Sequence, residues 1–427
     1  MLHMIIGGAG CGKSTRLMER VQAQVAAGER VITLVPEQFS YEFDQKLYRI
    51  LGPKAFNQLE THSFKSLARS VFQRFGCVPD GRKNADELTR MALLYQAVTA
   101  VSEREKKLRL LGRQCRQTSF LSELSAMFAQ FRRNGIQPEQ LYSSSALLNG
   151  RLQEKMLDLF EIYQKYDQLL AQHHLKDTET DLTEAAVIAN GQDAFLGDVV
   201  CLDEFESFTE DEYAMLDVLL SSCKDVYIAL RIDSTSAAPF SLFETVQGTM
   251  LRLKQLAAKL HISVETERCE TPYRFQSEEL RWLNQHIFRN TLPFTGDAPH
   301  LHILEAQSPE EEANYVCATI RRMLAQDTAL RCRDVAVLSN QMSDYKSILE
   351  TAMERYALPY YMDEKESMCY TPFLVYLHTL LGLLQNTKPD TELLLRLGKT
   401  GMTSCTPEEI AVLENYCYTW QIEGKTW

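Results

Sequence analysis

The first residues of the chain carry a glycine-rich motif whose residue types can bind the phosphates of a nucleotide. The run GGAGCGKS fits the pattern G-x-x-x-x-G-K-[ST] at every defined position. In such a loop, backbone N–H groups surround a β-phosphate, Lys13 reaches the β- and γ-phosphates, and the Ser14 hydroxyl is a ligand of Mg²⁺. The candidate nucleotide-binding residues are Gly7, Gly8, Ala9, Gly10, Cys11, Gly12, Lys13, Ser14 and Thr15.

The sequence on either side of the motif predicts the structural context that a phosphate-binding loop needs. Residues 4–6 form a short apolar run, which is typical of a buried parallel strand. After Ser14, the apolar residues Leu17, Val21 and Val25 recur at helical spacing. A helix that begins at the loop places its partial positive charge next to the phosphates. A glycine-rich turn without a ligand would not require this order of strand, loop and helix.

An acidic pair further along the chain supplies the second half of a nucleotide site. Residues 199–202 have the apolar pattern of a buried strand, and Asp203 and Glu204 follow directly. We expect Asp203 to hold Mg²⁺ together with Ser14, and Glu204 to be the catalytic base that orients an attacking water. Acidic pairs after strands are common by chance, so this prediction depends on the phosphate-binding motif about 190 residues upstream.

That long separation indicates an insertion between the two halves of the site. From about residue 85 to residue 175 the apolar residues recur at helical spacing. The recurring positions are Leu88, Met91, Tyr95, Val98, Met156, Leu159, Tyr163, Tyr166 and Leu170. Strand-like runs at 31–35, 59–60 and 226–230 complete the pattern of a parallel α/β sheet. We therefore predict a first α/β domain over residues 1–80 and 185–298, interrupted by a helical insertion over residues 81–184.

A second alternation of strands and helices begins near residue 301. The strand-like runs are 301–306, 334–339 and 359–364, and the segments between them are typical of helices. The segment TLPFTGDAPH, residues 291–300, is the best linker candidate. We expect residues 299–427 to be the start of a second α/β domain.

The bulk composition limits the classes of function. The chain has 427 residues, of which 45% are hydrophobic, and no apolar run reaches the length of a membrane span. Its eleven cysteines contain no C-x-x-C pair, so no zinc or iron–sulfur site has a local signature, and a reducing cytoplasm is expected. The formal net charge of −12 argues against indiscriminate coating of nucleic acid, but it leaves room for a local basic groove.

The chain resembles superfamily 1 helicases of the UvrD type. Thr61, His62, Ser63 and Phe64 stand where that family has its T-F-H-like motif, and Tyr273 and Arg274 stand at its Y-R motif. The resemblance implies two RecA-like domains and a P-loop that binds ATP. It also implies that Arg274 approaches the γ-phosphate as a catalytic residue.

A narrower resemblance is carried by the segments VPEQFSYEFD, THSFKSLA, CLDEFESFT and LENYCYTWQIEGKTW. They look like the B subunits of AddAB-type helicase–exonucleases of Firmicutes, which process DNA double-strand breaks for recombinational repair. The resemblance implies ATP and Mg²⁺, DNA ends and single strands, and a heterodimer with a motor and nuclease A subunit. It also implies a nuclease domain with an iron–sulfur cluster, whose cysteines are not in this sequence. We therefore expect the chain to be the N-terminal helicase-like part only.

Several departures from a working helicase put strand separation in doubt. Only six residues precede Gly7, which leaves no room here for the family's adenine-reading glutamine segment. No glutamine follows Asp233 at the expected place, and Pro36, Glu37 and Gln38 replace a threonine–asparagine pair. We therefore expect a weak or inactive motor that serves DNA binding and signal recognition. The alternatives are a competent helicase or translocase in its own right, and a nucleotide-binding scaffold without hydrolysis.

Basic residues of the insertion could line a groove for single-stranded DNA. A basic run contains Arg104, Lys106, Lys107, Arg109, Arg113 and Arg116, and Arg132 and Arg133 follow Phe131. The groove candidates are Thr61, His62, Arg113, Arg116, Arg132 and Arg133. The alternatives are a solvated helix face for the arginines and a helix cap for Thr61 and His62. Tyr163 and Tyr166 are predicted to be core residues rather than base-stacking platforms.

Overall fold

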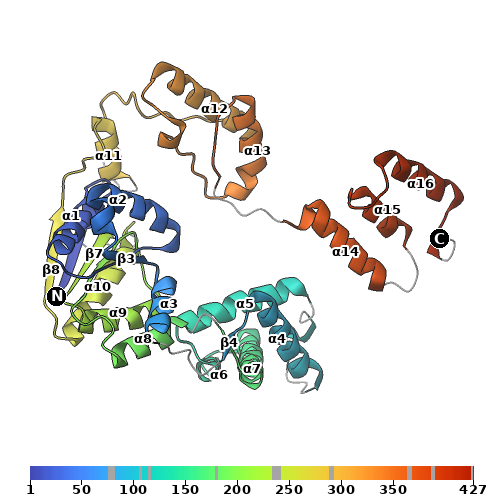
Figure 1. Cartoon of the computed structure of the whole chain (residues 1–427), viewed down its shortest axis with the longest axis horizontal. Helices are drawn as coiled ribbons and strands as arrows, with labels where there is room; N and C mark the ends of the chain where they lie inside the picture. Colours follow the sequence, from blue (N-terminus) through green and yellow to red (C-terminus); the bar gives the residue numbers. More distant parts are fainter. Residues whose placement is uncertain are drawn as a thin grey trace. The chain divides into compact units, whose positions relative to one another are not determined.

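The structure of the chain is a computed structural model in which two compact units can be distinguished. It describes residues 1–75, 82–104, 108–113, 117–177, 181–232, 242–287, 293–362, 368–385, 390–424 and 427. The first unit comprises Met1–Leu301 and the second comprises His302–Trp427 (Figure 1).

The first unit is built on a six-stranded sheet in which every neighbouring pair is parallel. Its strand order is β3-β2-β6-β7-β1-β8. The strands are β1 (Leu2–Gly7), β2 (Val31–Leu34), β3 (Leu59–His62), β6 (Val199–Leu202), β7 (Asp225–Arg231) and β8 (Val264–Cys269). The predicted α/β class with a parallel sheet is therefore confirmed. Because the strands are parallel, the residues that follow β1, β6 and β7 all lie along the same edge of the sheet.

Helices cover both faces of this sheet, because alternate residues of each strand point to opposite faces. Ile5 packs with α1 and α2, whereas Met4 and Ile6 pack with the helices of the other face, which include α3, α8, α9 and α10. The helices of this part are α1 (Lys13–Ala26), α2 (Ser40–Phe56), α3 (Phe64–Phe75), α8 (Asp181–Gly191), α9 (Glu210–Ser222), α10 (Glu244–Lys259) and α11 (Glu278–His286), with a 3₁₀ turn, η1, at Glu37–Phe39.

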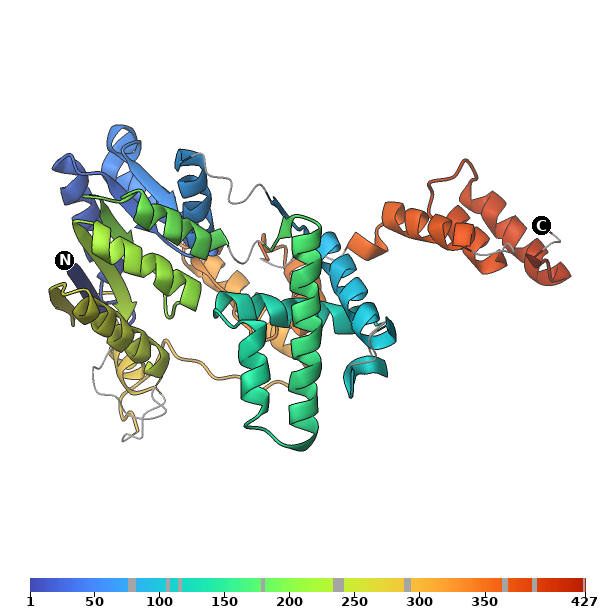
Figure 2. The same ribbon diagram turned by 90° about the horizontal axis from the view of Figure 1, so that it is seen from below.

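A helical bundle with its own core is inserted between α3 and α8. Its helices are α4 (Glu87–Thr99), α5 (Thr118–Arg133), α6 (Pro138–Ser145) and α7 (Gly150–Gln172), with short turns η3 (Ala100–Arg104) and η4 (Leu111–Arg113). The long helix α7 packs against α4 and α6 (Figure 2). The two-residue strands β4 (Lys83–Asn84) and β5 (Leu175–Lys176) pair where the chain enters and leaves the bundle.

A buried carboxylate holds one of the bundle's connecting segments. The side chain of Asp158 on α7 is fully buried and accepts hydrogen bonds from the backbone N–H groups of Arg109, Leu110 and Leu111, at 2.8–3.1 Å. A buried charge is tolerated when hydrogen-bond donors satisfy it in this way. The charge therefore fixes the start of η4 against the bundle.

The second unit is helical throughout its described residues. Its helices are α12 (Pro309–Gln326), α13 (Met342–Arg355), α14 (Pro372–Gln385), α15 (Thr391–Lys399) and α16 (Pro407–Trp420), with 3₁₀ turns at Cys332–Asp334 (η6) and Met368–Tyr370 (η7). A small core that includes Ala313, Cys317, Leu349 and Ala352 joins α12 to α13.

The strands expected in this second unit do not form. Residues 301–306, 334–339 and 359–362 pair with no other strand in the described part of the chain. A strand is stable only when its backbone N–H and C=O groups are paired with a neighbour. Val335 and Val337 are nevertheless partly buried against the α12–α13 core, whereas Ile303 is fully exposed. The apolar pattern of residues 334–339 therefore reflects side-chain packing against the α12–α13 core and not strand pairing. The assignment of a second RecA-like domain stays a prediction.

Across the described ranges, no helix has both the length and the apolar composition needed to span a lipid bilayer.

Candidate nucleotide-binding site

The glycine-rich loop joins β1 to α1, as the motif requires. Gly10 and Gly12 have φ angles of 72° and 80°, a region that favours glycine, and Gly12 is the residue that caps α1. A Cβ atom on Gly10 would lie 2.6 Å from the Cβ of Arg274, and one on Gly7 would lie 2.5 Å from the carbonyl oxygen of Cys269. Gly10 is therefore required both by its backbone conformation and by the close approach of the segment that follows β8. Gly12 is required by its conformation, and Gly7 by the close approach of β8.

Lys13, the residue predicted to reach the phosphates, is the first residue of α1 and lies directly after the loop. Its Nζ donates a hydrogen bond to the carbonyl oxygen of Gly8 at 2.7 Å. Burial lowers the pKa of Lys13, whereas the negative charge of Asp203 acts in the opposite direction. The ammonium group is therefore partly removed from water and held close to a carboxylate. An anion stabilises a partly desolvated ammonium group more strongly than one in water.

Asp203 lies close enough to Lys13 for their charges to interact. The carboxylate follows β6, and its side chain is only 3% exposed. Its Oδ1 accepts a hydrogen bond from the N–H of Glu204 at 2.9 Å, and its Oδ2 has no hydrogen-bond partner in the described part of the chain. Burial raises the pKa of Asp203 to about 6, and the nearby Ser14 hydroxyl acts against that rise.

This arrangement suits a hard divalent cation. Mg²⁺ in nucleotide sites takes one or two protein oxygen ligands and completes its shell with waters and phosphate oxygens. The buried, unpaired Oδ2 of Asp203 and the Ser14 hydroxyl are two such oxygens. The residues present therefore fit the metal that the motif implies.

Glu204 has an unusual backbone conformation beside this carboxylate. Its φ angle is 63°, in the left-handed region that side chains other than glycine seldom adopt. Its own side chain is exposed and makes no hydrogen bond or ion pair with the described residues. Strained backbone of this kind clusters at functional sites, where surrounding contacts impose it. The Glu204 carboxylate is therefore exposed directly after Asp203, the residue predicted to hold the metal.

Tyr273 and Arg274 lie against the loop although about 260 residues separate them from it in the sequence. The N–H of Arg274 donates to the carbonyl oxygen of Gly10 at 3.3 Å. The ring of Tyr273, which is 72% exposed, lies 3.5 Å from where a Cβ on Gly12 would be. The Arg274 side chain is exposed and has no carboxylate partner among the described residues. An open cation and an open aromatic ring therefore border the loop.

The remaining predicted nucleotide-site residues are spread along the loop and the first turn of α1. Gly8, Ala9 and Ser14 are half-buried, and Thr15 is exposed. Cys11 is buried, and its Sγ lies 3.9 Å from the carbonyl oxygens of Ala9 and Glu270. The thiol is thus a packing group that joins the loop to the segment after β8.

Comparison with known proteins agrees with this geometry. The family model described as ADDB, N-terminal, matches residues 4–284, which is more than half of the chain. The chain belongs to this family. The matched range contains the loop, the Asp203–Glu204 pair and the Tyr273–Arg274 pair.

Curated relatives that are named as the B subunit of an ATP-dependent helicase/deoxyribonuclease match 99–100% of the chain. The protein of Clostridium tetani is 27% identical over 448 residues, and that of Thermoanaerobacter sp. (strain X514) is 28% identical over 437 residues. That of Clostridium acetobutylicum is 26% identical over 434 residues, with 99% of this chain covered. The chain spans 37–38% of the length of these relatives.

The two residues predicted to contact DNA from β3 are engaged within the protein. The Thr61 hydroxyl lies 2.8 Å from the hydroxyl of Thr33. The His62 ring nitrogens lie 3.3 Å from Glu60 Oε2 and 3.3 Å from Ser66 Oγ, and the side chain is 18% exposed. A contact with DNA would have to replace these bonds, and it stays a prediction.

Arg132 is not a groove residue, and the prediction that it lines an open DNA-binding surface is wrong. Its side chain is only 12% exposed and forms ion pairs with Asp167 and Asp177. Its guanidinium lies 5.6 Å from the ring centres of Tyr163 and Tyr166. Arginine can be buried when carboxylates and aromatic faces surround its delocalised charge, as here. Tyr163 and Tyr166 are each 1% exposed, so their assignment to the core is confirmed.

Among the other basic candidates, the structure describes the side chains of Arg109 and Arg133 only. Burial raises the pKa values of Asp211 and Glu212 at the start of α9, and the nearby Arg133 guanidinium acts in the opposite direction. Arg109 is exposed. The predictions on Lys106, Lys107, Arg116 and Asp233, and on the side chains of Arg104 and Arg113, lie outside the described residues.

One charged residue at this edge of the sheet was not singled out from the sequence. Arg231 is the last residue of β7 and stands opposite Gly7 in the parallel register. The signal that could have identified it is its place directly after the apolar run 226–230, where a parallel strand ends at the ligand-binding edge.

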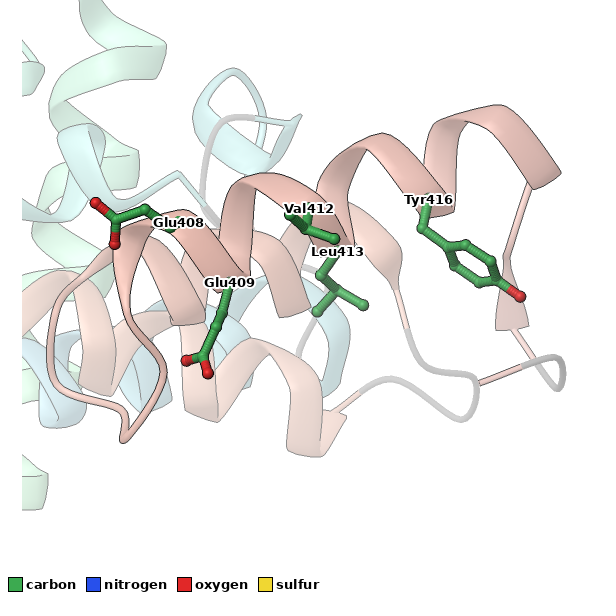
Figure 3. A pocket seen from close by; sticks show the side chains of 5 residues that line it. All are labelled: Glu408, Glu409, Val412, Leu413 and Tyr416. Carbon is green, nitrogen blue, oxygen red and sulfur yellow. The ribbon is translucent and has the colours of Figure 1, made fainter.

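A hollow in the second unit does not have the chemistry of a phosphate site. It is lined by Glu408, Glu409, Val412, Leu413 and Tyr416, all from α16 (Figure 3). Its polar lining is acidic and would repel an anion. In the described part of the chain, no group of three or more His, Cys, Asp or Glu side chains is placed to hold a metal ion.

The burial of the Asp203 carboxylate leads to a prediction about stability. The folded-state pKa of Asp203 is about 6, above its ordinary value of 3.8, so its ionisation opposes folding as the pH rises through that window. Asp203→Asn should therefore stabilise the nucleotide-free protein relative to wild type at pH 8 but not at pH 4. The difference should reach at most about 3 kcal/mol, from the value of 1.36 kcal/mol per pKa unit. Urea unfolding of both proteins at the two pH values measures it.

The same substitution should weaken stabilisation by Mg-ATP, because Asn is a poorer ligand for the metal. Added Mg-ATP should raise the unfolding midpoint of wild type more than that of Asp203→Asn. Equal stability of the two proteins at both pH values would contradict the burial of an ionised Asp203 in the free protein.

Proposed function

We propose that this chain binds Mg-ATP and is the helicase-like part of a B subunit that acts on DNA ends. The observation that carries this proposal is the convergence of Lys13, Ser14 and Asp203 at one edge of the parallel sheet. The complete loop motif and the matched family model support it.

The proposed roles follow from the chemistry of each group. The backbone N–H groups from Gly8 to Thr15 bind the phosphates, together with the N-terminus of α1. Lys13 exchanges its bond with the Gly8 carbonyl for phosphate oxygens. Ser14 and Asp203 hold Mg²⁺, which neutralises charge on the β- and γ-phosphates when it is bound.

Two further residues would act on the terminal phosphate. Glu204 orients the attacking water and accepts its proton, because its carboxylate is adjacent to Asp203 and has no hydrogen bond or ion pair with the described residues. Arg274 supplies positive charge near the transferred phosphate, because its exposed guanidinium has no carboxylate partner among the described residues and its backbone is bonded to the loop. The exposed ring of Tyr273 offers an aromatic surface to the nucleotide base.

The wider proposal concerns DNA and a partner subunit, and it is supported by the names of the relatives. We infer that the whole protein works in the cytoplasm as a heterodimer with a motor and nuclease A subunit and processes double-strand breaks for recombinational repair. This chain would bind DNA ends or single strands and read a signal, with a weak or inactive motor. Two departures from a working helicase support a weak motor. No glutamine follows Asp233 at the expected place, and Pro36, Glu37 and Gln38 replace the DNA-contact pair.

The iron–sulfur cluster implied by the resemblance does not fit the residues of this chain. Its cysteines have no cluster spacing, and the described ones form no ligand group. No step of the proposed function therefore depends on a cluster here.

Binding and hydrolysis of ATP by the isolated chain, with and without single-stranded DNA, test the proposal. We expect Mg-ATP binding that calorimetry can measure and slow hydrolysis that DNA raises by less than about threefold. If single-stranded DNA raises the rate of ATP hydrolysis by about tenfold or more, as expected for a competent translocase, the weak-motor part of the proposal is overturned. An absence of nucleotide binding would overturn the proposal as a whole.

A further inference from the structure

Arg231 occupies a position in the sheet where a cation can reach a bound nucleotide. Strand β7 lies between β6, which leads into Asp203, and β1, which leads into the phosphate-binding loop. Arg231 ends this strand opposite Gly7, and the next residue, Ile232, donates its N–H to the Gly7 carbonyl oxygen at 3.0 Å. The base of the Arg231 side chain is therefore fixed directly beside the start of the loop.

The side chain is held by a partner that it can exchange. Arg231 forms an ion pair with Glu206, and each of the two side chains is 56% exposed. Exposed ion pairs contribute little to stability, so a stronger anion can displace the carboxylate at small cost. Glu206 lies on the loop that follows Asp203, and its carbonyl oxygen accepts a hydrogen bond from Thr249 of α10 at 2.9 Å. This bond anchors the loop through its backbone and leaves the Glu206 side chain free to turn away.

The charges around Lys13 show that Arg231 belongs to the same electrostatic environment. The Arg231 guanidinium and the Lys13 ammonium group are close enough for their positive charges to repel each other. Two cations that repel each other across a small region are stabilised by an anion that binds between them. Their arrangement beside a phosphate-binding loop favours a polyphosphate over a single carboxylate.

We propose that Arg231 is a phosphate-binding residue that leaves Glu206 to contact the terminal phosphate of a bound nucleoside triphosphate. The inference rests on the proposed nucleotide binding and identifies a residue that distinguishes triphosphate from diphosphate. The terminal phosphate is the expected contact because Arg231 lies on the Asp203 side of the loop, whereas the loop N–H groups surround the β-phosphate. Glu206 then acts as the competitor that holds the guanidinium until a triphosphate arrives.

Calorimetric titration of Mg-ATP and Mg-ADP into matched variants tests this inference. Arg231→Ala should weaken Mg-ATP binding by about 10- to 100-fold, as expected for a lost hydrogen bond between charged groups, and change Mg-ADP binding by less than twofold. Arg231→Lys should recover part of the loss, and Glu206→Ala should tighten Mg-ATP binding by about two- to fivefold. Arg252→Ala is the matched control, because it removes an arginine from another exposed ion pair, with Glu210.

The outcomes separate this inference from the proposed function. If Arg231→Ala leaves both affinities unchanged, or lowers both equally while wild type binds both nucleotides, Arg231 does not contact the terminal phosphate and nucleotide binding still stands. If wild type binds neither nucleotide, the proposed function fails and this inference fails with it. Circular dichroism of each variant establishes that an altered affinity does not come from unfolding.

Discussion

Replacing Lys13 by alanine is expected to abolish measurable Mg-ATP binding and leave the fold intact. In the proposed complex the ammonium group neutralises phosphate charge inside a partly buried loop, where water cannot take its place. Removing one partner of such a charge pair costs about 2–5 kcal/mol or more, which corresponds to a loss of affinity of roughly 30- to 5,000-fold. The only hydrogen bond of the Lys13 side chain among the described residues is to the Gly8 carbonyl oxygen, so little stability depends on that side chain. Calorimetry measures the affinity, and thermal unfolding measures the fold.

Lys224→Ala is a matched control for this experiment. Lys224 is an exposed lysine of the same unit, paired with Glu29, and it directly precedes β7 at the opposite edge of the sheet. Its removal changes the net charge of the protein by the same amount without touching the loop. Equal ATP affinity in Lys13→Ala and in Lys224→Ala would show that the loop does not bind phosphate through its lysine.

The strands that could be predicted from the sequence are those buried on both faces. Residues 199–202 are completely buried between β2 and β7, and this environment requires the continuous apolar run that identified them. Strand β8 was missed because it lies at the sheet edge and pairs only with β1. Its sequence, VETERC, carries Glu265, Glu267 and Arg268, as expected for an edge strand that must avoid pairing with other molecules.

Helical periodicity identified the insertion but not the orientation of every helix. Leu88 and Tyr95 belong to the apolar positions that recur at helical spacing, yet they are 82% and 45% exposed. The buried face of α4 is formed instead by Leu93, Leu94, Ala97 and Val98. Several apolar stripes can be drawn on a helix that is apolar nearly all round, and only the neighbouring helices decide which stripe is buried.

The candidate site could be predicted wherever one local motif carries the chemistry. The loop and the acidic pair each have a residue pattern that predicts phosphate and metal binding, and the structure brings Ser14 and Asp203 together. The ion pair of Arg231 with Glu206 has no such pattern, because it depends on strand order and register. The burial of Arg132 could not be predicted either, because its partners Asp167 and Asp177 come from another part of the bundle.

The final prediction separates metal binding from catalysis. Glu204→Gln should leave Mg-ATP affinity nearly unchanged and lower the rate of ATP hydrolysis by a factor of about 10² to 10⁴, the usual contribution of a general base. The amide keeps the size of the side chain but cannot accept a proton from water, and Asp203 remains to hold the metal. The Glu204 backbone N–H that binds Asp203 Oδ1 is also retained, so the geometry of the neighbouring carboxylate should not change.

Single-turnover hydrolysis, with affinity measured in parallel, gives the two quantities separately. Glu210→Gln is the control, since it neutralises an exposed carboxylate of α9 that is paired with Arg252 away from the loop. If Glu204→Gln hydrolyses ATP at the wild-type rate, either Glu204 is not the base or the measured activity comes from a contaminating ATPase. Lys13→Ala distinguishes these two explanations, because it removes hydrolysis by this chain and leaves that of a contaminant. A loss of Mg-ATP binding in Glu204→Gln would instead place Glu204 among the groups that hold the nucleotide and its metal.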